Sequence, residues 1–159
     1  MMGLLAAVII AALGGFIFFI IGQSLPRRWF DPGAFIYRSH KWEKGGRIYE
    51  RVYVRKWKDI VPDMSRIIPG VFKKKAALAT DAKKMRRLIK ETCVAELVHW
   101  LLIIFITPMV FRAMRGLGGF LAAIIYALGN LVFIIIQRYN RPRLVALCKR
   151  MEKRREKCS

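Results

Sequence analysis

The sequence predicts an all-α integral membrane protein with three transmembrane helices and cytoplasmic interfacial amphipathic helices. Of its 159 residues, 55% are hydrophobic, yet the chain carries 30 Lys and Arg against 10 Asp and Glu. These two properties are separated along the chain, because three runs at about 4–25, 94–111 and 118–136 are nearly free of charged residues. Each run approaches the ~20 residues that a helix needs to cross the hydrocarbon core of a bilayer.

The whole chain, 1–159, is predicted to form a single membrane domain. Between and after the spans lie a cytoplasmic interfacial segment at 26–93 and a basic cytoplasmic tail at 137–159. Basic residues concentrate in these two stretches, so the positive-inside rule places the N-terminus outside and the C-terminus in the cytoplasm. The first run lacks the basic start and the cleavage site of a secretory signal, so we expect a retained span.

Local patterns predict where the elements begin and end. In the first span, Gly14, Gly15 and Gly22 indicate places where another helix could approach closely. Residues 46–58 mix aromatic and basic side chains; they suit a strand or an interfacial helix, and we favour the helix. A further helix is expected to run from Thr80 through the second span to Pro108. The tail is predicted to form a short basic helix at about 144–156.

Two ionisable residues lie close together at the start of the second span. Glu96 and His99 are three residues apart, so they share one face of a helix. Such groups are costly inside a membrane, which indicates a function. A carboxylate that fixes the tautomer of a histidine makes the histidine a general base. The alternative is a polar pair that joins helices through hydrogen bonds. No metal site is predicted, because no ligand pattern connects these residues with His40 or Cys93.

Two further clusters flank the spans. The end of the third span is crowded with side chains suited to phosphate, carboxylate or sugar: Gln137, Arg138, Tyr139, Asn140, Arg141 and Arg143. Asn130, two turns deeper on the same helix, could point at the same site. The interfacial segment holds a third cluster: Arg55, Lys56, Trp57 and Asp63. For both clusters, simple anchoring at the lipid headgroups competes with substrate binding.

Three motifs resemble those of the glycosyl-4,4'-diaponeurosporenoate acyltransferases, which act late in bacterial staphyloxanthin-type carotenoid synthesis. The motifs are Arg55-Lys56-Trp57-Lys58 followed by Asp63, Ala95-Glu96-Leu97-Val98-His99-Trp100, and Gln137-Arg138-Tyr139-Asn140-Arg141-Pro142-Arg143-Leu144. The resemblance implies a multi-pass O-acyltransferase of the bacterial plasma membrane. It would move a fatty acyl group onto a sugar hydroxyl of a membrane glycolipid, with a glycosyl carotenoid as the named acceptor. Its partners would be membrane lipids, the lipid-linked sugar acceptor and an acyl donor.

The expected mechanism needs no cofactor, only acyl-CoA or another acyl thioester as co-substrate. Arg138, Arg141 and Arg143 would attract the phosphates of the donor. His99, oriented by Glu96, would act as the base. The developing oxyanion would be stabilised by Asn140, Asn130 or an arginine.

Alternative functions remain open at this point. The chain could be a non-catalytic scaffold that binds anionic lipids, or another lipid-modifying transferase. Nucleic acid is not an expected partner, because the positive-inside rule already accounts for the basic residues. The glycine-bearing helices would allow a homo-oligomer.

Overall fold

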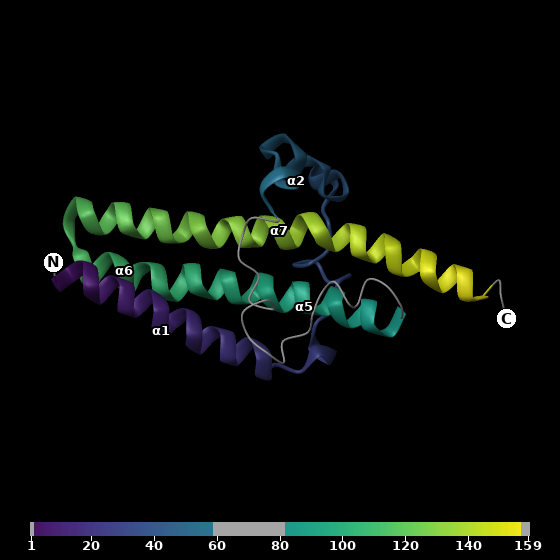
Figure 1. Cartoon of the computed structure of the whole chain (residues 1–159), viewed down its shortest axis with the longest axis horizontal. Helices are drawn as coiled ribbons and strands as arrows, with labels where there is room; N and C mark the ends of the chain where they lie inside the picture. The colour runs from purple at the N-terminus through teal and green to yellow at the C-terminus, as the bar shows by residue number, and fades with distance from the viewer. Residues whose placement is uncertain (1, 59–81, 157–159) are drawn as a thin grey trace. The chain divides into compact units, whose positions relative to one another are not determined.

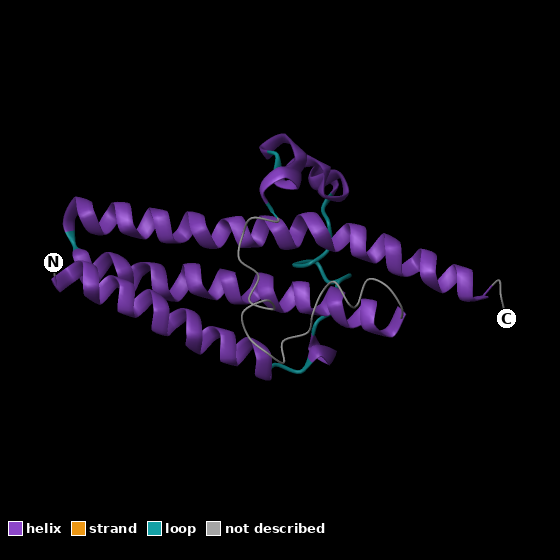
Figure 2. Cartoon of the chain, viewed as in Figure 1, coloured by secondary structure: helices purple, strands orange, loops and turns teal. Residues whose placement is uncertain are grey.

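The computed structural model describes residues 2–58 and 82–156. Four longer α-helices account for most of them: α1 (Met2–Ser24), α5 (Ala82–Leu101), α6 (Thr107–Met114) and α7 (Gly116–Glu156) (Figure 1). The described residues contain no strand (Figure 2). Three helical stretches are long and apolar enough to cross a membrane: Met2–Ser24, Ala82–Met114 and Gly116–Lys153. The predicted all-α fold with three membrane spans is therefore confirmed.

The chain divides into two compact units. The first unit comprises Met1–Pro26 and Val94–Ile135, and the second comprises Arg27–Cys93 and Ile136–Ser159. Helices α5 and α7 contribute residues to both. The single domain predicted at 1–159 stays a prediction, and each unit is described here by itself.

Close packing of α1 against the second span organises the first unit. The core includes Ala7 from α1 and Leu102, Ile106 and Val110 from the second span. A Cβ atom added to Gly14 would lie 2.6 Å from Ile106 Cδ1. At Gly22 an added Cβ would lie 2.8 Å from Val98 Cγ2, whereas at Gly15 it would meet nothing within 4 Å. Gly14 and Gly22 thus mark close helix approaches, as predicted, and Gly15 does not.

The second span does not end at Pro108. A π-helical turn at Leu102–Ile106 leads into α6, and Pro108 lies in the first turn of that helix. Proline lacks an amide hydrogen and its ring crowds the carbonyl four residues earlier, so an ordinary α-helix is disturbed at this position. The wider π-turn accommodates the proline. The chain therefore stays helical to Met114.

The basic tail is not a separate helix. Helix α7 runs from Gly116 to Glu156 with Pro142 inside it, so the residues predicted as a short helix from Leu144 continue the third span (Figure 1). The segment before α5 is also helical but broken. The 3-10 helix η2 (Lys41–Val52) is kinked, and α2 (Val54–Trp57) follows after Tyr53, which has a left-handed backbone with φ 53°. The predicted continuous interfacial helix is thus interrupted, and its position on the lipid headgroups stays a prediction.

Three consecutive residues with a left-handed backbone make the kink in η2, and two of them, after Lys44, are glycines. Gly45 and Gly46 have φ values of 66° and 86°, in the left-handed region that glycine adopts without a steric penalty. Gly46 also lies against α7, because a Cβ atom there would be 3.1 Å from Tyr139 O and from Arg143 Nη1. A Cβ at Gly45 would meet nothing within 4 Å. Both glycines serve the turn, but only Gly46 also permits close packing on α7.

This difference predicts unequal effects for two alanine substitutions. Gly45→Ala should lower the free energy of unfolding by about 1 kcal/mol through backbone strain alone. Gly46→Ala adds a steric clash to the strain and should cost about 3 kcal/mol. Thermal unfolding of both variants in the same detergent micelles measures the difference. Equal losses would show that Gly46 does not pack against the α7 backbone.

Candidate active site

The first unit holds a histidine whose ring is fixed by two neighbours. His99 on α5 places its Nδ1 2.9 Å from Oδ1 of Asn130 on α7. The other end of the amide donates from Nδ2 to the carbonyl oxygen of Tyr126 at 2.9 Å. Because Nδ2 faces a carbonyl, Oδ1 must face the histidine, and an oxygen acceptor requires a hydrogen on Nδ1. In the neutral ring, Nε2 therefore carries the lone pair and can accept a proton.

Stacking fixes the plane of the same imidazole. The rings of His99 and Phe133 lie 4.6 Å apart with an interplanar angle of 7°. Phe133 follows Asn130 on α7 by about one helical turn, so one helix provides both the hydrogen bond and the stacking surface. The histidine is held in orientation at its Nδ1 edge and on its face. A fixed orientation of this kind is a requirement for a general base.

Glu96 lies on α5 one turn before His99 and is fully buried, with 0% of its surface exposed. It was the residue predicted to orient the histidine. His99 Nδ1 contacts Asn130, which the sequence analysis named as a candidate for substrate binding and for stabilising the oxyanion, not for orienting the histidine. A catalytic contribution from Glu96 stays a prediction.

In the second unit, a buried carboxylate that the sequence analysis missed binds one of the predicted arginines. Glu43 is 1% exposed, and its Oε1 accepts a hydrogen bond from Arg138 Nε at 2.7 Å. Tyr49 donates its hydroxyl to the same oxygen at 2.5 Å, and the His40 amide donates to Oε2 at 2.7 Å. Nothing in the local sequence distinguished Glu43 from other polar residues of a basic segment. Its burial depends on the left-handed turn that follows it.

These contacts determine the charge state of Glu43. Burial by itself raises the pKa of the carboxyl group, but the hydrogen bonds from Arg138, Tyr49 and the His40 amide outweigh it. The pKa of Glu43 therefore falls below its ordinary value of 4.5. Burial and the bond to Glu43 raise the pKa of the Tyr49 phenol. Glu43 is thus an anion that compensates the charge of Arg138.

The other two predicted arginines are also engaged within the protein. Arg141 is 2% exposed and donates to Thr92 Oγ1 at 2.8 Å, to Thr92 O at 2.9 Å and to Tyr37 O at 2.7 Å. Arg143 donates to Tyr139 O at 2.6 Å and to Glu50 Oε1 at 2.6 Å. Its guanidinium carbon also lies 3.6 Å from the centre of the Tyr139 ring. The guanidinium groups that were expected to bind phosphate instead make hydrogen bonds within this unit.

The remaining predicted site residues have varied surroundings. Gln137 and Tyr139 are buried and Asn140 is partly exposed. On α2, Arg55 and Lys56 are exposed, Lys56 Nζ lies 5.0 Å from the centre of the Tyr53 ring, and Trp57 Nε1 donates to Val52 O at 2.7 Å. Asp63 lies outside the described residues. Within the described ranges, no group of three His, Cys, Asp or Glu side chains could hold a metal ion.

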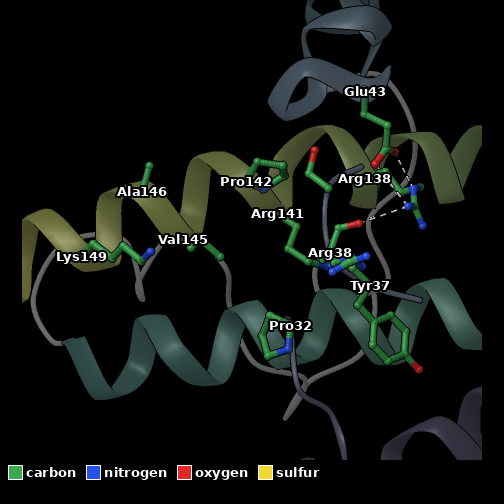
Figure 3. Close-up of a pocket in the computed structure, with 11 residues that line it drawn as sticks. Pro32, Tyr37, Arg38, Glu43, Arg138, Arg141, Pro142, Val145, Ala146 and Lys149 are labelled. Atoms are coloured by element: carbon green, nitrogen blue, oxygen red, sulfur yellow. Dashed lines mark hydrogen bonds and ion pairs between the residues drawn. The ribbon is translucent and has the colours of Figure 1, made fainter. Parts of the chain in front are cut away.

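A pocket of about 340 Å³ opens in the second unit beside the Glu43–Arg138 pair (Figure 3). Its lining combines basic, apolar and hydroxyl-bearing side chains: Pro32, Tyr37, Arg38, Ser39, Glu43, Arg138, Arg141, Pro142, Val145, Ala146 and Lys149. The volume lies at the lower end of the range for small-molecule sites. A lining with both cationic and apolar side chains suits an anion that carries an apolar group.

The contacts of Glu43 predict how the stability of the fold changes at acid pH. Because the folded pKa lies below the ordinary value of 4.5, ionised Glu43 stabilises the fold above that pH, and this stabilisation is lost as the pH falls through the folded pKa. At pH 7, Glu43→Gln leaves Arg138 without its counter-charge and should cost about 3 kcal/mol.

Thermal unfolding in detergent between neutral pH and pH 3 tests this pattern. The difference in unfolding free energy between wild type and Glu43→Gln should shrink below pH 4.5. In Tyr49→Phe, which removes one hydrogen bond that lowers the folded pKa of Glu43, the loss of unfolding free energy on acidification should be smaller and should be complete at a higher pH. A difference between wild type and Glu43→Gln that is independent of pH would contradict the assignment of Glu43 as the titrating anion.

Comparison with known proteins supplies the family. Residues 26–150 match the family model described as glycosyl-4,4'-diaponeurosporenoate acyltransferase. A relative of that name from Staphylococcus aureus strain N315 is 29% identical over 138 residues, which cover 86% of this chain and 82% of the relative. Another from strain MRSA252 is 31% identical over 143 residues, with the same coverage. No solved structure matches significantly. The family match spans all three motifs noted in the sequence, and the chain therefore belongs to the glycosyl-4,4'-diaponeurosporenoate acyltransferase family of enzymes.

Proposed function

We propose that this enzyme transfers a fatty acyl group from an acyl thioester, acyl-CoA in the simplest case, to a sugar hydroxyl of a glycosyl carotenoid. The acceptor follows from the names of the relatives, which are acyltransferases of a glycosylated diaponeurosporenoate. Three apolar helices suit an acceptor with a long hydrocarbon body and a donor with a fatty chain. Each methylene that leaves water contributes about 0.8 kcal/mol to binding.

We propose that the reaction takes place at the cytoplasmic leaflet of a bacterial plasma membrane. The basic residues that follow α1 and end α7 support a topology with the N-terminus outside and the C-terminus in the cytoplasm. An acyl thioester made in the cytoplasm would meet the enzyme on that side.

His99 is the proposed base, and its contact with Asn130 is the observation that carries the mechanism. Nε2 removes the proton from the sugar hydroxyl as the oxygen attacks the thioester carbonyl carbon. A C–O ester bond forms and the C–S bond breaks. The proton then passes from the imidazolium to the departing thiolate, which leaves as a free thiol. The histidine returns to its neutral form without a change of tautomer.

Asn130 is better suited to orienting the histidine than to stabilising the oxyanion. Its amide already contacts His99 through Oδ1 and Tyr126 O through Nδ2. Turning Nδ2 toward an oxyanion would break the bond to Tyr126 and withdraw Oδ1 from the histidine. We therefore assign Asn130 a positioning role.

The function is tested with purified enzyme in lipid nanodiscs, supplied with palmitoyl-CoA and a glycosyl carotenoid. Mass spectrometry should detect an ester whose mass is the acceptor plus the palmitoyl group, together with one equivalent of free CoA thiol. His99→Ala should lower the rate by 10²- to 10⁴-fold, the usual contribution of a positioned general base. An active wild type with an equally active His99→Ala variant would remove His99 from the mechanism.

The positioning role predicts different results for two substitutions of Asn130. Asn130→Leu has no acceptor for Nδ1–H, so kcat should fall by about two orders of magnitude, as for the loss of a correctly positioned base. Asn130→Asp keeps an oxygen at the same place and should retain activity within about tenfold of wild type. Steady-state kinetics at matched protein levels would distinguish them. Equal losses of kcat in both variants would argue against orientation through this oxygen.

A further inference from the structure

The pocket in the second unit contains two groups of cations with different surroundings. Arg138 is bound to Glu43, and Arg141 is buried with hydrogen bonds to Thr92 and Tyr37. Arg38 and Lys149 also line the pocket, and both are exposed. Lys149 makes no hydrogen bond or ion pair with any residue that the structure describes. Arg38 lies over the Phe35 ring, with its guanidinium carbon 5.1 Å from the ring centre. The exposed cations are therefore the ones available to a ligand.

Apolar side chains lie beside these cations. Pro142, Val145 and Lys149 come from α7, and Pro32 and Arg38 come from the segment between α1 and η2 (Figure 3). A ligand that fits both surfaces has an anionic group next to an apolar one. The volume of about 340 Å³ fits part of a large molecule rather than a complete CoA thioester.

We propose that this pocket binds the phosphate-bearing end of the acyl donor, with Arg38 and Lys149 contacting its phosphates. The inference rests on the proposed use of a thioester donor, and it differs from the expectation that Arg138, Arg141 and Arg143 bind the phosphates. Arg38 offers a planar fork and Lys149 a mobile point charge, and both types of side chain bind phosphate. Arg138 and Arg141 shape the wall of the pocket while they remain bound to protein groups.

The test compares two double variants that each remove two positive charges. Arg38→Gln with Lys149→Gln changes the pocket. Arg47→Gln with Arg150→Gln changes exposed residues that do not line it, one of them adjacent to Lys149 on α7. Each enzyme is assayed in nanodiscs of zwitterionic lipid with palmitoyl-CoA, and with palmitoyl-N-acetylcysteamine, a thioester that has no phosphate.

The pocket variant should raise KM for palmitoyl-CoA about tenfold with kcat unchanged, since exposed charge pairs each contribute modestly. With the phosphate-free donor its KM should equal that of wild type. The control variant should have the KM of wild type for both donors. Added salt should reduce the difference in KM for palmitoyl-CoA between the pocket variant and wild type.

Four outcomes would overturn the assignment. One is an unchanged KM for palmitoyl-CoA in the pocket variant. Another is an equal rise in KM for both donors, or in both double variants. The last is a rise that appears only when anionic phospholipid is added to the nanodiscs, which would make the pocket a site for a lipid headgroup. A wild-type enzyme that transfers no acyl group from either thioester would instead refute the proposed function itself.

Discussion

Lipid offers no hydrogen bonds, so a polar side chain within the apolar helices must find its partner inside the protein. In the first unit this constraint links three groups in sequence. The Tyr126 carbonyl orients the Asn130 amide, the amide oxygen fixes the hydrogen on His99 Nδ1, and the ring is left with its lone pair on Nε2. Stacking on Phe133 holds the ring plane. The same surroundings therefore fix the tautomer and the ring plane of His99.

In the second unit, burial within the protein requires partners for basic side chains in a similar way. The formal net charge is +20, yet several of these cations stabilise the protein rather than face a ligand. Arg141 joins Thr92 to Tyr37, and Arg138 binds Glu43, which directly precedes the left-handed turn at 44–46. Burial therefore separates structural from available cations. Arg38 and Lys149 belong to the second kind because they are exposed and line a pocket.

The sequence predicted the features that depend on neighbouring residues, and it did not predict those that depend on contacts between distant parts of the chain. The three spans were predictable because membrane insertion depends on the composition of about 20 consecutive residues. His99 and Asn130 stood out as polar residues in apolar runs, but their contact across 31 positions depends on how α5 and α7 rotate against each other. Glu43 gave no local signal, since its burial arises from a turn and a distant arginine. A helix was expected to reach Pro108 and a separate tail helix to begin at about residue 144, yet helix continues past Pro108 and through Pro142. At Pro108 the need to satisfy the backbone in apolar surroundings outweighs the local preference of proline.

The central claim is that Asn130 holds His99 as the Nδ1–H tautomer, with the lone pair on Nε2. The chain contains only two histidines, so ¹⁵N-histidine labelling of a His40→Gln variant in nanodiscs isolates the imidazole signals of His99. At neutral pH we expect a protonated Nδ1 and an unprotonated Nε2, and we expect Asn130→Leu to abolish this preference. A spectrum in which Nε2 carries the hydrogen in the wild-type background would contradict the assignment of His99 as the base.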